Sequence, residues 1–367
     1  MIAIVMNWTL ACALVASVTS CGGKQLDLGG TASTPGDGVV ASWPVADQRN
    51  PRSLRSKGHH LYWIADRGER GAVLRCEKRD CGNTVIPIVE VENTGLWGIE
   101  IHDDVLFAID SRSILSCPTS GCSRPRIVVA DAEASAVAFD DVNVYWSHRG
   151  KFAIYFCPHA SCGQTSTLES GIRTDAVELA VSDAKSFWIQ ADDAYPQTPA
   201  SIRVVPKDGS AIWSTFAGVQ DQAASLTVRD GFVYWATSVT GGTIARCPST
   251  GCSARPEIVA QSQYFPHFVD PAGEMIFWMN GATLPGDLRS VEILGCQTSD
   301  CAATMEVLDT GLGASSGTRN RTFPSRELVV DDEAIYWIGD IVKLSGPVDG
   351  GVAVVGSIRR TERRRAR

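Results

Sequence analysis

Residues 226–259 read LTVRDGFVYWATSVTGGTIARCPSTGCSARPEIV and contain four short segments rich in β-branched and aromatic residues. The segments are residues 226–228, 232–236, 243–247 and 256–259. Turn residues such as Asp230-Gly231 separate them, a pattern typical of short strands joined by hairpins. We therefore expect this stretch to form one four-stranded antiparallel unit.

An aromatic motif in the second segment recurs along the chain. Its copies are Leu61-Tyr62-Trp63, Leu106-Phe107-Ala108, Val144-Tyr145-Trp146, Ser186-Phe187-Trp188, Val233-Tyr234-Trp235, Ile276-Phe277-Trp278 and Ile335-Tyr336-Trp337. The third positions are 38 to 59 residues apart, and repeats of about 40–50 residues are typical of propeller blades. The sequence predicts an all-β chain in which residues 38–357 form a seven-bladed β-propeller of four-stranded antiparallel blades.

The ends of such a ring need a partner, because an open strand edge invites aggregation. We expect residues 39–43, Val-Val-Ala-Ser-Trp, to pack on the last blade, within residues 335–355. The longest interval between motifs has its excess near Asp309–Thr318. We expect a projecting loop there, and long loops on rigid scaffolds often carry function.

Ten of the twelve cysteines form five pairs with the spacing C-x4-C. The pairs are Cys76/Cys81, Cys117/Cys122, Cys157/Cys162, Cys247/Cys252 and Cys296/Cys301. Each pair lies between the third and fourth segments of its repeat, where opposed hairpin residues have Cα atoms about 4.5–5.5 Å apart, within disulfide range. We expect each pair to close its own hairpin. A zinc site is the alternative, but each pair is in a different repeat and no nearby ligand completes a set of four.

Two copies lack cysteines at this place. They have Val205–Ser210 and Gly346–Gly351, in which proline precedes Asp-Gly, a turn sequence in its own right. We expect both segments to form the same hairpin without a disulfide.

An acidic turn usually follows the first segment of each repeat. The residues are Asp103-Asp104, Asp140-Asp141, Asp183, Asp230, Asp270 and Asp331-Asp332. Aspartate favours turns through hydrogen bonds to nearby backbone groups. A calcium loop would need several oxygen ligands at close, alternating spacing, a pattern not found here. The sequence predicts no metal site and no cofactor.

We expect the aromatic motif to fill the space between blades, because neighbouring strand residues face opposite sides of a sheet. A ring of aromatic side chains that stacks on carbohydrate is the alternative. No metalloprotease, P-loop or dinucleotide motif occurs, and we predict no catalytic residue.

Residues 1–20, MIAIVMNWTLACALVASVTS, are apolar and end in small residues, which is typical of a secretory signal peptide. Val18-Thr19-Ser20-Cys21 resembles a bacterial lipobox, and the resemblance implies that Cys21 is acylated and anchors the chain in a membrane. Residues 21–37 are rich in Gly, Ser and Thr and are expected to form a flexible tether. A cleaved signal peptide with an incidental Cys21 is the alternative.

The last residues, 358–367, contain six arginines from Arg359 onward. We expect a basic, disordered tail. Contact of this tail with an anionic lipid or polymer is the alternative.

The repeat pattern VYW…G-x-I-x-R-C-P-x-x-G-C, clearest at Val233–Trp235 and Cys247–Cys252, resembles propeller repeats of secreted lipoproteins from myxobacteria and related bacteria. It is also distantly similar to the YWTD propellers of lipoprotein receptors, over residues 45–357. The YWTD family has six blades and a Thr-Asp after Tyr-Trp, which this chain lacks. The resemblance therefore implies the fold and no activity.

The net charge of −8 argues against a nucleic-acid partner, and the cysteine content suits an oxidising compartment. We expect a non-catalytic lipoprotein of the bacterial cell envelope, outside the cytoplasm and facing the periplasm or the cell surface. Its propeller would be a scaffold for an unidentified protein or polysaccharide. The alternative is an extracytoplasmic enzyme of the lyase, glycosidase or quinoprotein type with its site in the propeller channel.

Overall fold

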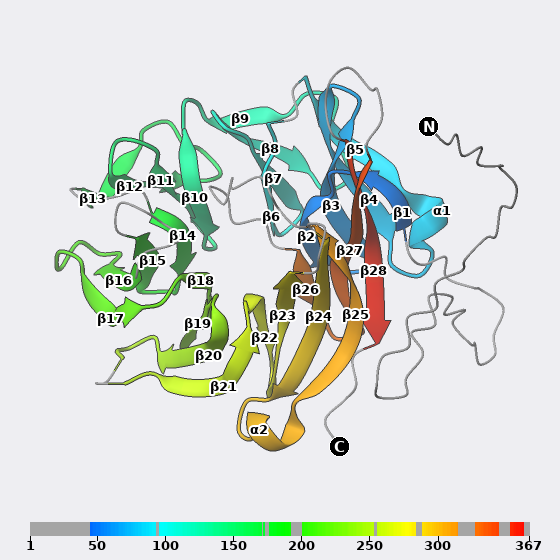
Figure 1. Cartoon of the computed structure of the whole chain (residues 1–367). Helices are drawn as coiled ribbons and strands as arrows, with labels where there is room; N and C mark the ends of the chain where they lie inside the picture. The colour runs from blue at the N-terminus through cyan, green and yellow to red at the C-terminus, as the bar shows by residue number, and fades with distance from the viewer. Residues whose placement is uncertain are drawn as a thin grey trace, which may run out of the picture. The chain divides into compact units, whose positions relative to one another are not determined.

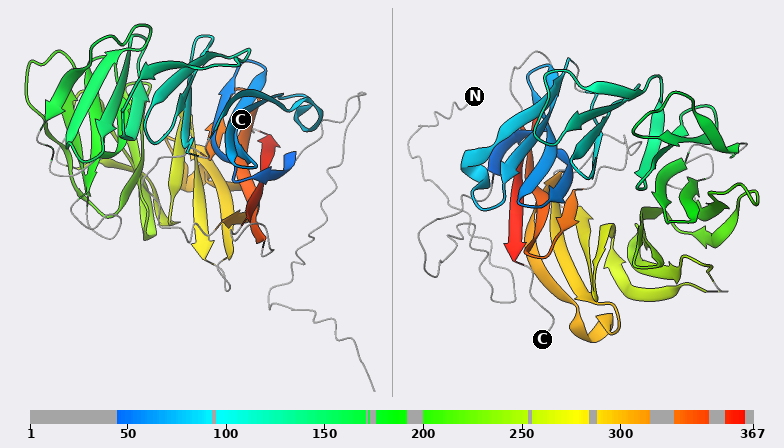
Figure 2. Two further views of the ribbon diagram at one scale, coloured as in Figure 1. Left: turned by 90° about the horizontal axis from the view of Figure 1, so that it is seen from above. Right: turned by 180° about the vertical axis from the view of Figure 1, so that it is seen from behind.

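A computed structural model describes residues 45–92, 95–170, 172, 176–191, 200–252, 255–283, 288–314, 327–344 and 353–362. The predicted signal peptide, Cys21 and the tether lie outside these residues, in a unit of residues 1–40 that is separate from residues 41–367. In the second unit, seven four-stranded antiparallel sheets surround a common axis (Figure 1). Figure 2 shows the same ring of sheets from two further sides. The predicted seven-bladed β-propeller is confirmed.

Each blade contributes four strands, numbered here from the axis outward. Blade 1 contains β2 (Arg52–Lys57), β3 (His60–Arg67), β4 (Arg70–Glu77) and β5 (Ile86–Val91); blade 2 contains β6 (Gly98–His102), β7 (Val105–Ile109), β8 (Ile114–Pro118) and β9 (Arg126–Val129). Blade 3 contains β10 (Ala134–Phe139), β11 (Asn143–His148), β12 (Ala153–Pro158) and β13 (Ser166–Ser170); blade 4 contains β14 (Ala176–Val181), β15 (Lys185–Ala191), β16 (Ala200–Pro206) and β17 (Ser214–Gln220).

The remaining blades follow the same plan. Blade 5 contains β18 (Ala223–Arg229), β19 (Phe232–Thr237), β20 (Thr240–Pro248) and β21 (Glu257–Tyr264); blade 6 contains β22 (His267–Ala272), β23 (Met275–Thr283), β24 (Leu288–Gln297) and β25 (Glu306–Ala314). Blade 7 contains β26 (Leu328–Val330), β27 (Ala334–Leu344), β28 (Ala353–Glu362) and β1 (Val45–Arg49).

Blade 7 closes the ring with strands from both ends of the chain. β1 pairs antiparallel with β28, with Val45 opposite Ile358 and Arg49 opposite Val355. Residues 39–43, which we expected here, lie outside the described residues. The predicted start of the tail at residue 358 is wrong, because β28 continues to Glu362.

The outer hairpin predicted at Gly346–Gly351 is also wrong. These residues connect β27 to β28, the second and third strands of blade 7. The N-terminal β1 supplies the fourth strand, so blade 7 has no hairpin between its third and fourth strands. In blade 4, Lys207–Trp213 connects β16 to β17 as predicted.

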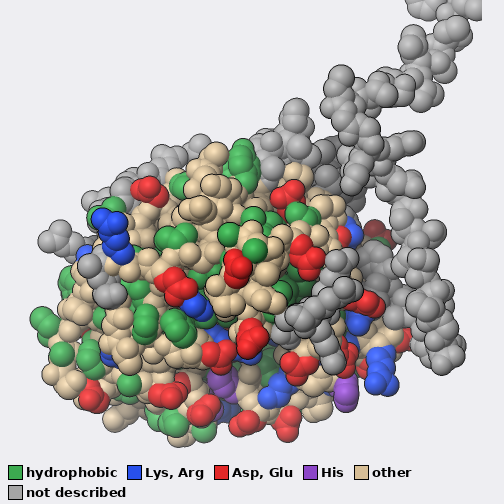
Figure 3. All heavy atoms as spheres, turned by 90° about the horizontal axis from the view of Figure 1, so that it is seen from below, with side chains coloured by type: hydrophobic (Ala, Val, Ile, Leu, Met, Phe, Trp, Pro, Cys, Tyr) green, Lys and Arg blue, Asp and Glu red, His purple; other side chains and the backbone are tan. Residues whose placement is uncertain are grey.

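The aromatic motif lies between the blades, as expected. In all seven copies the second residue faces the next blade and the third residue faces the preceding one. Tyr234 and Trp278, for example, belong to the cluster between blades 5 and 6, whereas Trp235 packs between blades 4 and 5. Outside these clusters, apolar side chains are dispersed among polar and charged ones on the face shown in Figure 3.

Several tryptophan indoles also donate a hydrogen bond to the preceding blade. Trp63, Trp235 and Trp278 donate to the side-chain oxygens of Gln48, Gln220 and Gln263, each at 3.1 Å and each 15 residues earlier in the chain. The spacing Gln-x14-Trp is therefore a sequence signal for this inter-blade contact that the aromatic repeat alone does not reveal.

Trp337 makes the equivalent bond to Asp309, at 3.1 Å. Asp309 lies in β25, which extends to Ala314. The prediction of a projecting loop is therefore wrong for residues 309–314. These residues belong to the outer strand of blade 6, which is longer than its counterparts. Residues 315–318 lie outside the described residues.

The five cysteine pairs are disulfides, and each closes its own hairpin. The bonds are Cys76–Cys81, Cys117–Cys122, Cys157–Cys162, Cys247–Cys252 and Cys296–Cys301, with Cα–Cα distances of 4.9–5.8 Å. They close two kinds of hairpin. In the Cys-Pro hairpins, the residue three positions after proline donates its backbone N–H to the prolyl carbonyl, as Gly251 does to Pro248 at 3.1 Å. In the Asp-Cys hairpins, a helical turn begins at the second cysteine: α1 (Cys81–Thr84) and α2 (Cys301–Thr304).

In both kinds of hairpin the first cysteine is a strand residue and the second is not. Cys122, Cys162 and Cys252 precede the fourth strands β9, β13 and β21 and are half-buried, whereas their buried partners lie within the third strands. The turn after proline reverses the chain at once, so the second cysteine comes before the ladder begins. In blade 2, for example, the first pair of that ladder is Ser116 with Arg126.

These half-buried cysteines still contact the preceding blade. Cys122, Cys162 and Cys252 pack at the margins of the apolar clusters that their blades form with blades 1, 2 and 4. The backbone N–H of Cys122 also donates to the carbonyl of Ile88 in blade 1 at 2.9 Å. The disulfide therefore fixes a connecting loop against the neighbouring blade rather than joining two paired strands.

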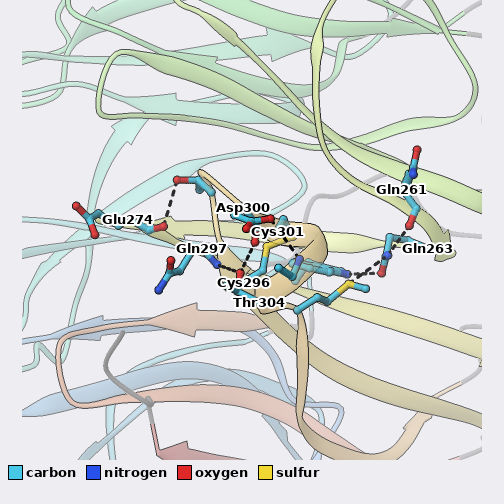
Figure 4. The surroundings of a disulfide bond; sticks show 12 residues. Gln261, Gln263, Glu274, Cys296, Gln297, Asp300, Cys301 and Thr304 are labelled. Atoms are coloured by element: carbon cyan, nitrogen blue, oxygen red, sulfur yellow. Dashed lines mark hydrogen bonds between the residues drawn. A yellow bond between two sulfur atoms is a disulfide. The ribbon is translucent and has the colours of Figure 1, made fainter. Parts of the chain in front are cut away.

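A threonine locks the helical-turn hairpins. Figure 4 shows the Cys296–Cys301 disulfide beside Thr304, whose hydroxyl accepts the backbone N–H of Gln297 at 2.9 Å and donates to the carbonyl of Asp300 at 2.6 Å. Thr84 makes the same contacts with Glu77 and Asp80. The sequence signature of this hairpin is D-C-x-x-T.

We predict that replacing both Cys247 and Cys252 with serine leaves the propeller folded and lowers its free energy of unfolding by about 2 kcal/mol, the loop-entropy value for so short a loop. Blade 4 joins its third and fourth strands without cysteines. Urea unfolding followed by tryptophan fluorescence measures the change. Loss of the folded baseline in the variant would contradict a merely supporting role for the disulfide.

Candidate functional site: the central channel and its mouth

The first strands of all seven blades line a central cavity of about 420 Å³. Its wall contains the ionisable residues Arg55, Glu100, His102, Glu178, Arg229 and Asp270. Pockets of about 300–1,000 Å³ are typical of small-molecule sites. The sequence could not show this grouping, because the six residues come from five different repeats.

Bulges in the first strands bring serine side chains to the neighbouring blade. Ser53 and Ser225 have φ angles of +55° and +59° at such bulges. Their hydroxyls accept the backbone N–H groups of Ile99, at 2.9 Å, and Phe268, at 2.5 Å. Each serine therefore ties the first strand of its blade to the first strand of the next.

The charged residues of the wall make similar ties. The carboxylate of Glu178 accepts the backbone N–H groups of Ser225 and Leu226, at 2.8 and 2.5 Å. Arg55 donates to the carboxylate of Glu100 at 3.0 Å in a pair that joins blades 1 and 2.

Asp270 accepts the backbone N–H of Val330 at 2.9 Å. The acidic turn predicted at Asp270 is wrong, because Asp270 lies within β22 and faces blade 7. Most of the charge on the channel wall is thus engaged in holding adjacent blades together.

The acidic turns combine local and inter-blade contacts. Asp140 accepts the backbone N–H groups of Val142, at 2.9 Å, and Asn143, at 2.7 Å, the expected turn bonds. It also accepts from the ammonium of Lys207 in blade 4 at 2.5 Å and from the Tyr145 hydroxyl at 2.7 Å. No group of three His, Cys, Asp or Glu side chains that could hold a metal occurs among the described residues.

Blades 7 and 1 share the same arrangement. Asp331 accepts the backbone N–H groups of Glu333 and Ala334 at 2.9 Å and pairs with Lys78 of blade 1 at 2.5 Å. Burial opposes the charge of Asp331, but the Lys78 pair and the turn bonds hold its pKa below the usual value. The sequence did not predict a role for Lys78, because its partner Asp331 belongs to a blade that is distant in the chain.

One mouth of the channel, on the side of the acidic turns and outer hairpins, carries an aromatic cluster. His102, at the end of β6, stacks on His159 with ring centroids 5.9 Å apart and lies 5.3 Å from the Phe139 ring. Phe107 lies 4.8 Å from Phe139 beneath them. His159 belongs to the disulfide hairpin of blade 3, so the fold joins residues that the sequence places in separate repeats.

Arg229 lies at the same mouth, because it ends β18 as His102 ends β6. Its side chain is exposed, whereas His102 and Phe139 are half-buried. We call His102, Phe139, His159 and Arg229 the mouth cluster. It offers aromatic surface, imidazole donors or acceptors and a guanidinium within one partly accessible region.

No protein-family model matches the chain, and no curated protein sequence matches it. Several solved structures match the chain. An uncharacterised protein, lmo1340, from Listeria monocytogenes has 7% identity and a TM-score of 0.52, covering 83% of this chain and 93% of its own. A puromycin-hydrolysing peptidase from Mycobacterium tuberculosis has 15% identity and a TM-score of 0.52, covering 88% of this chain.

This chain spans 55% of the length of that peptidase. A chain of a nidogen/laminin complex has 14% identity and a TM-score of 0.49, covering 69% of this chain and 92% of its own. The two matches with a TM-score of 0.52 have identities so low that they show a shared fold alone. No helix of the described residues is long and apolar enough to cross a membrane.

We predict that the Asp140–Lys207 contact makes stability depend on acid pH. Burial alone would raise the pKa of Asp140, but Lys207 and the turn bonds lower it to about 2 from an ordinary value of 3.8. A depressed pKa adds stability above the ordinary value, and this stability is lost as the pH falls from about 4 to about 2. Allowing for solvent screening, Asp140→Asn should cost about 1 kcal/mol at pH 6.

The loss of unfolding free energy caused by Asp140→Asn should become smaller towards pH 2. Urea unfolding at several pH values measures this loss. Asp230→Asn, in the equivalent exposed turn of blade 5, is the matched control. Equal losses for the two variants at every pH would contradict the inter-blade role of Asp140.

Proposed function

We propose that this chain is a non-catalytic lipoprotein of the bacterial cell envelope whose propeller binds a protein or polysaccharide partner at the mouth cluster. One observation carries the proposal: the charged groups deeper in the channel hold neighbouring blades together, whereas the mouth cluster stays partly accessible. Aromatic residues and arginine are enriched in protein interfaces, particularly among residues that dominate the binding energy.

The disulfides support a location of this chain outside the cytoplasm. Five disulfides are typical of a protein outside the cytoplasm. Acylation of Cys21 would then hold the chain at a membrane, since each buried CH₂ contributes about 0.8 kcal/mol and several chains together give a stable anchor.

An extracytoplasmic enzyme is the second candidate. Its support is the convergence of Arg55, Glu100 and His102 on one cavity wall. Arg55 and Glu100 pair with each other between blades, which favours the scaffold. Turnover of a polysaccharide or quinone by the purified chain, with no captured partner, would reverse this preference.

We predict that chemical cross-linking in envelope fractions, followed by a pull-down of the tagged chain, recovers a specific partner. Arg229→Glu should reduce recovery at least about fivefold, because it reverses the exposed charge of the mouth cluster without removing an inter-blade contact. Arg112→Glu is the matched control, since Arg112 is exposed in the β7–β8 loop at the opposite end of the channel. Equal recovery with the two variants would exclude the mouth cluster as the binding surface.

We predict that Cys21→Ser moves the chain from the membrane fraction to the soluble fraction. Metabolic labelling with an alkyne-bearing fatty acid should mark the wild-type chain and leave the variant unmarked. Cys12→Ser, within the predicted signal peptide, is the control and should retain the label. A labelled Cys21→Ser variant would contradict acylation at this residue.

A further inference from the structure

The outer strand of blade 4 differs from the other six. The fourth strands of blades 1, 2, 3, 5, 6 and 7 each contain a charged residue or proline, whereas β17, Ser-Thr-Phe-Ala-Gly-Val-Gln, contains neither. Charges, proline and β-bulges on an edge strand protect it against pairing with another chain. β17 has two register shifts but neither a charge nor a proline. β17 runs along the outer edge of the ring (Figure 1), with its free side unpaired by any described strand.

The same edge carries unusual apolar exposure. Ile212, just before β17, is 82% exposed, and Val219 is 76% exposed. They are the two most exposed of the large apolar side chains among the described residues. Exposed apolar groups at both ends of an edge strand without charge or proline favour contact with another chain.

From these observations we infer that β17 is a homodimer interface, at which two copies of this chain add their edges as an antiparallel pair centred on Ala217. The positions of the register shifts in β17 are compatible with such a twofold axis. β17 pairs with β16 through Thr215, Ala217 and Val219, and the register shifts on each side of Ala217. The irregularities therefore lie symmetrically about the proposed axis.

The side chains are also self-complementary. This register places Thr215 opposite Val219 of the second copy, a β-branched pair of the kind that stabilises antiparallel strands. Thr215 and Val219 lie opposite Arg203 and Ser201 on β16, so both occupy one face of blade 4. Each pair occurs twice in the dimer.

Opposite charges meet at the two ends of the pairing. Trp213 would lie opposite Asp221 of the second copy. The Arg203 guanidinium stacks on the Trp213 ring at 4.7 Å and donates to the Thr215 hydroxyl. The exposed carboxylate of Asp221 would thus approach a guanidinium of the other copy, at both ends of the pair. No other fourth strand among the described residues combines an uncharged centre with such complementary flanks. This inference does not depend on partner binding at the mouth cluster.

Sedimentation velocity of the secreted full chain carrying Cys21→Ser tests the dimer without a lipid contribution. We expect a concentration-dependent dimer. Val219→Lys should raise the dissociation constant of the dimer at least about tenfold. The twofold axis places one introduced lysine against the partner strand in each of the two copies. Ile127→Lys is the matched control, since Ile127 is 59% exposed on the outer strand of blade 2, and it should leave the dissociation constant unchanged.

Cysteine cross-linking tests the register. The double variant Thr215→Cys/Val219→Cys should form disulfide-linked dimers on mild oxidation, whereas Val219→Cys alone should not, because the two Val219 residues are far apart across the axis. A monomer at all concentrations, equal effects of Val219→Lys and Ile127→Lys, or equal cross-linking of the single and double variants would overturn the inference.

Discussion

Packing between neighbouring blades is the constraint on which the rest of this structure depends. A four-stranded sheet has two apolar faces and cannot bury either alone. Each blade interface buries a Tyr or Phe from one blade, and in six of the seven a Trp from the next. Because every blade depends on both neighbours, the ring has to close, and the β1–β28 pair provides that closure.

Polar contacts, like the apolar ones, hold neighbouring blades together. The serines at the bulges, the channel carboxylates and the Asp–Lys pairs each join one blade to the next. A buried carboxylate is expensive unless its hydrogen bonds are satisfied, so groups engaged in this way are poorly available for chemistry. The channel wall therefore contains many ionisable residues but leaves few for a substrate, and accessible chemistry concentrates at the mouth.

The repeat made most of the fold predictable from sequence, because most blades carry the same aromatic pair, acidic turn and outer hairpin. Errors occurred where one copy departs from the plan. Blade 7 takes β1 from the N-terminal side, so Gly346–Gly351 connects inner strands, and β25 continues through the predicted loop. The mouth cluster was not predictable, since His102 and His159 come from different repeats and meet only because neighbouring blades place a strand end beside a hairpin.

Differences between copies also indicate what kind of ligand the mouth can accept. The last residues of the seven first strands are Lys57, His102, Phe139, Val181, Arg229, Ala272 and Val330. Only valine occurs twice among them, so the mouth offers no symmetric ring of ligands for an ion on the axis. A ligand that is recognised by this irregular set of aromatic, cationic and aliphatic groups needs a surface that is equally irregular. Under the proposed function, a partner bound at the mouth would contact several blades at once, each through a different side chain.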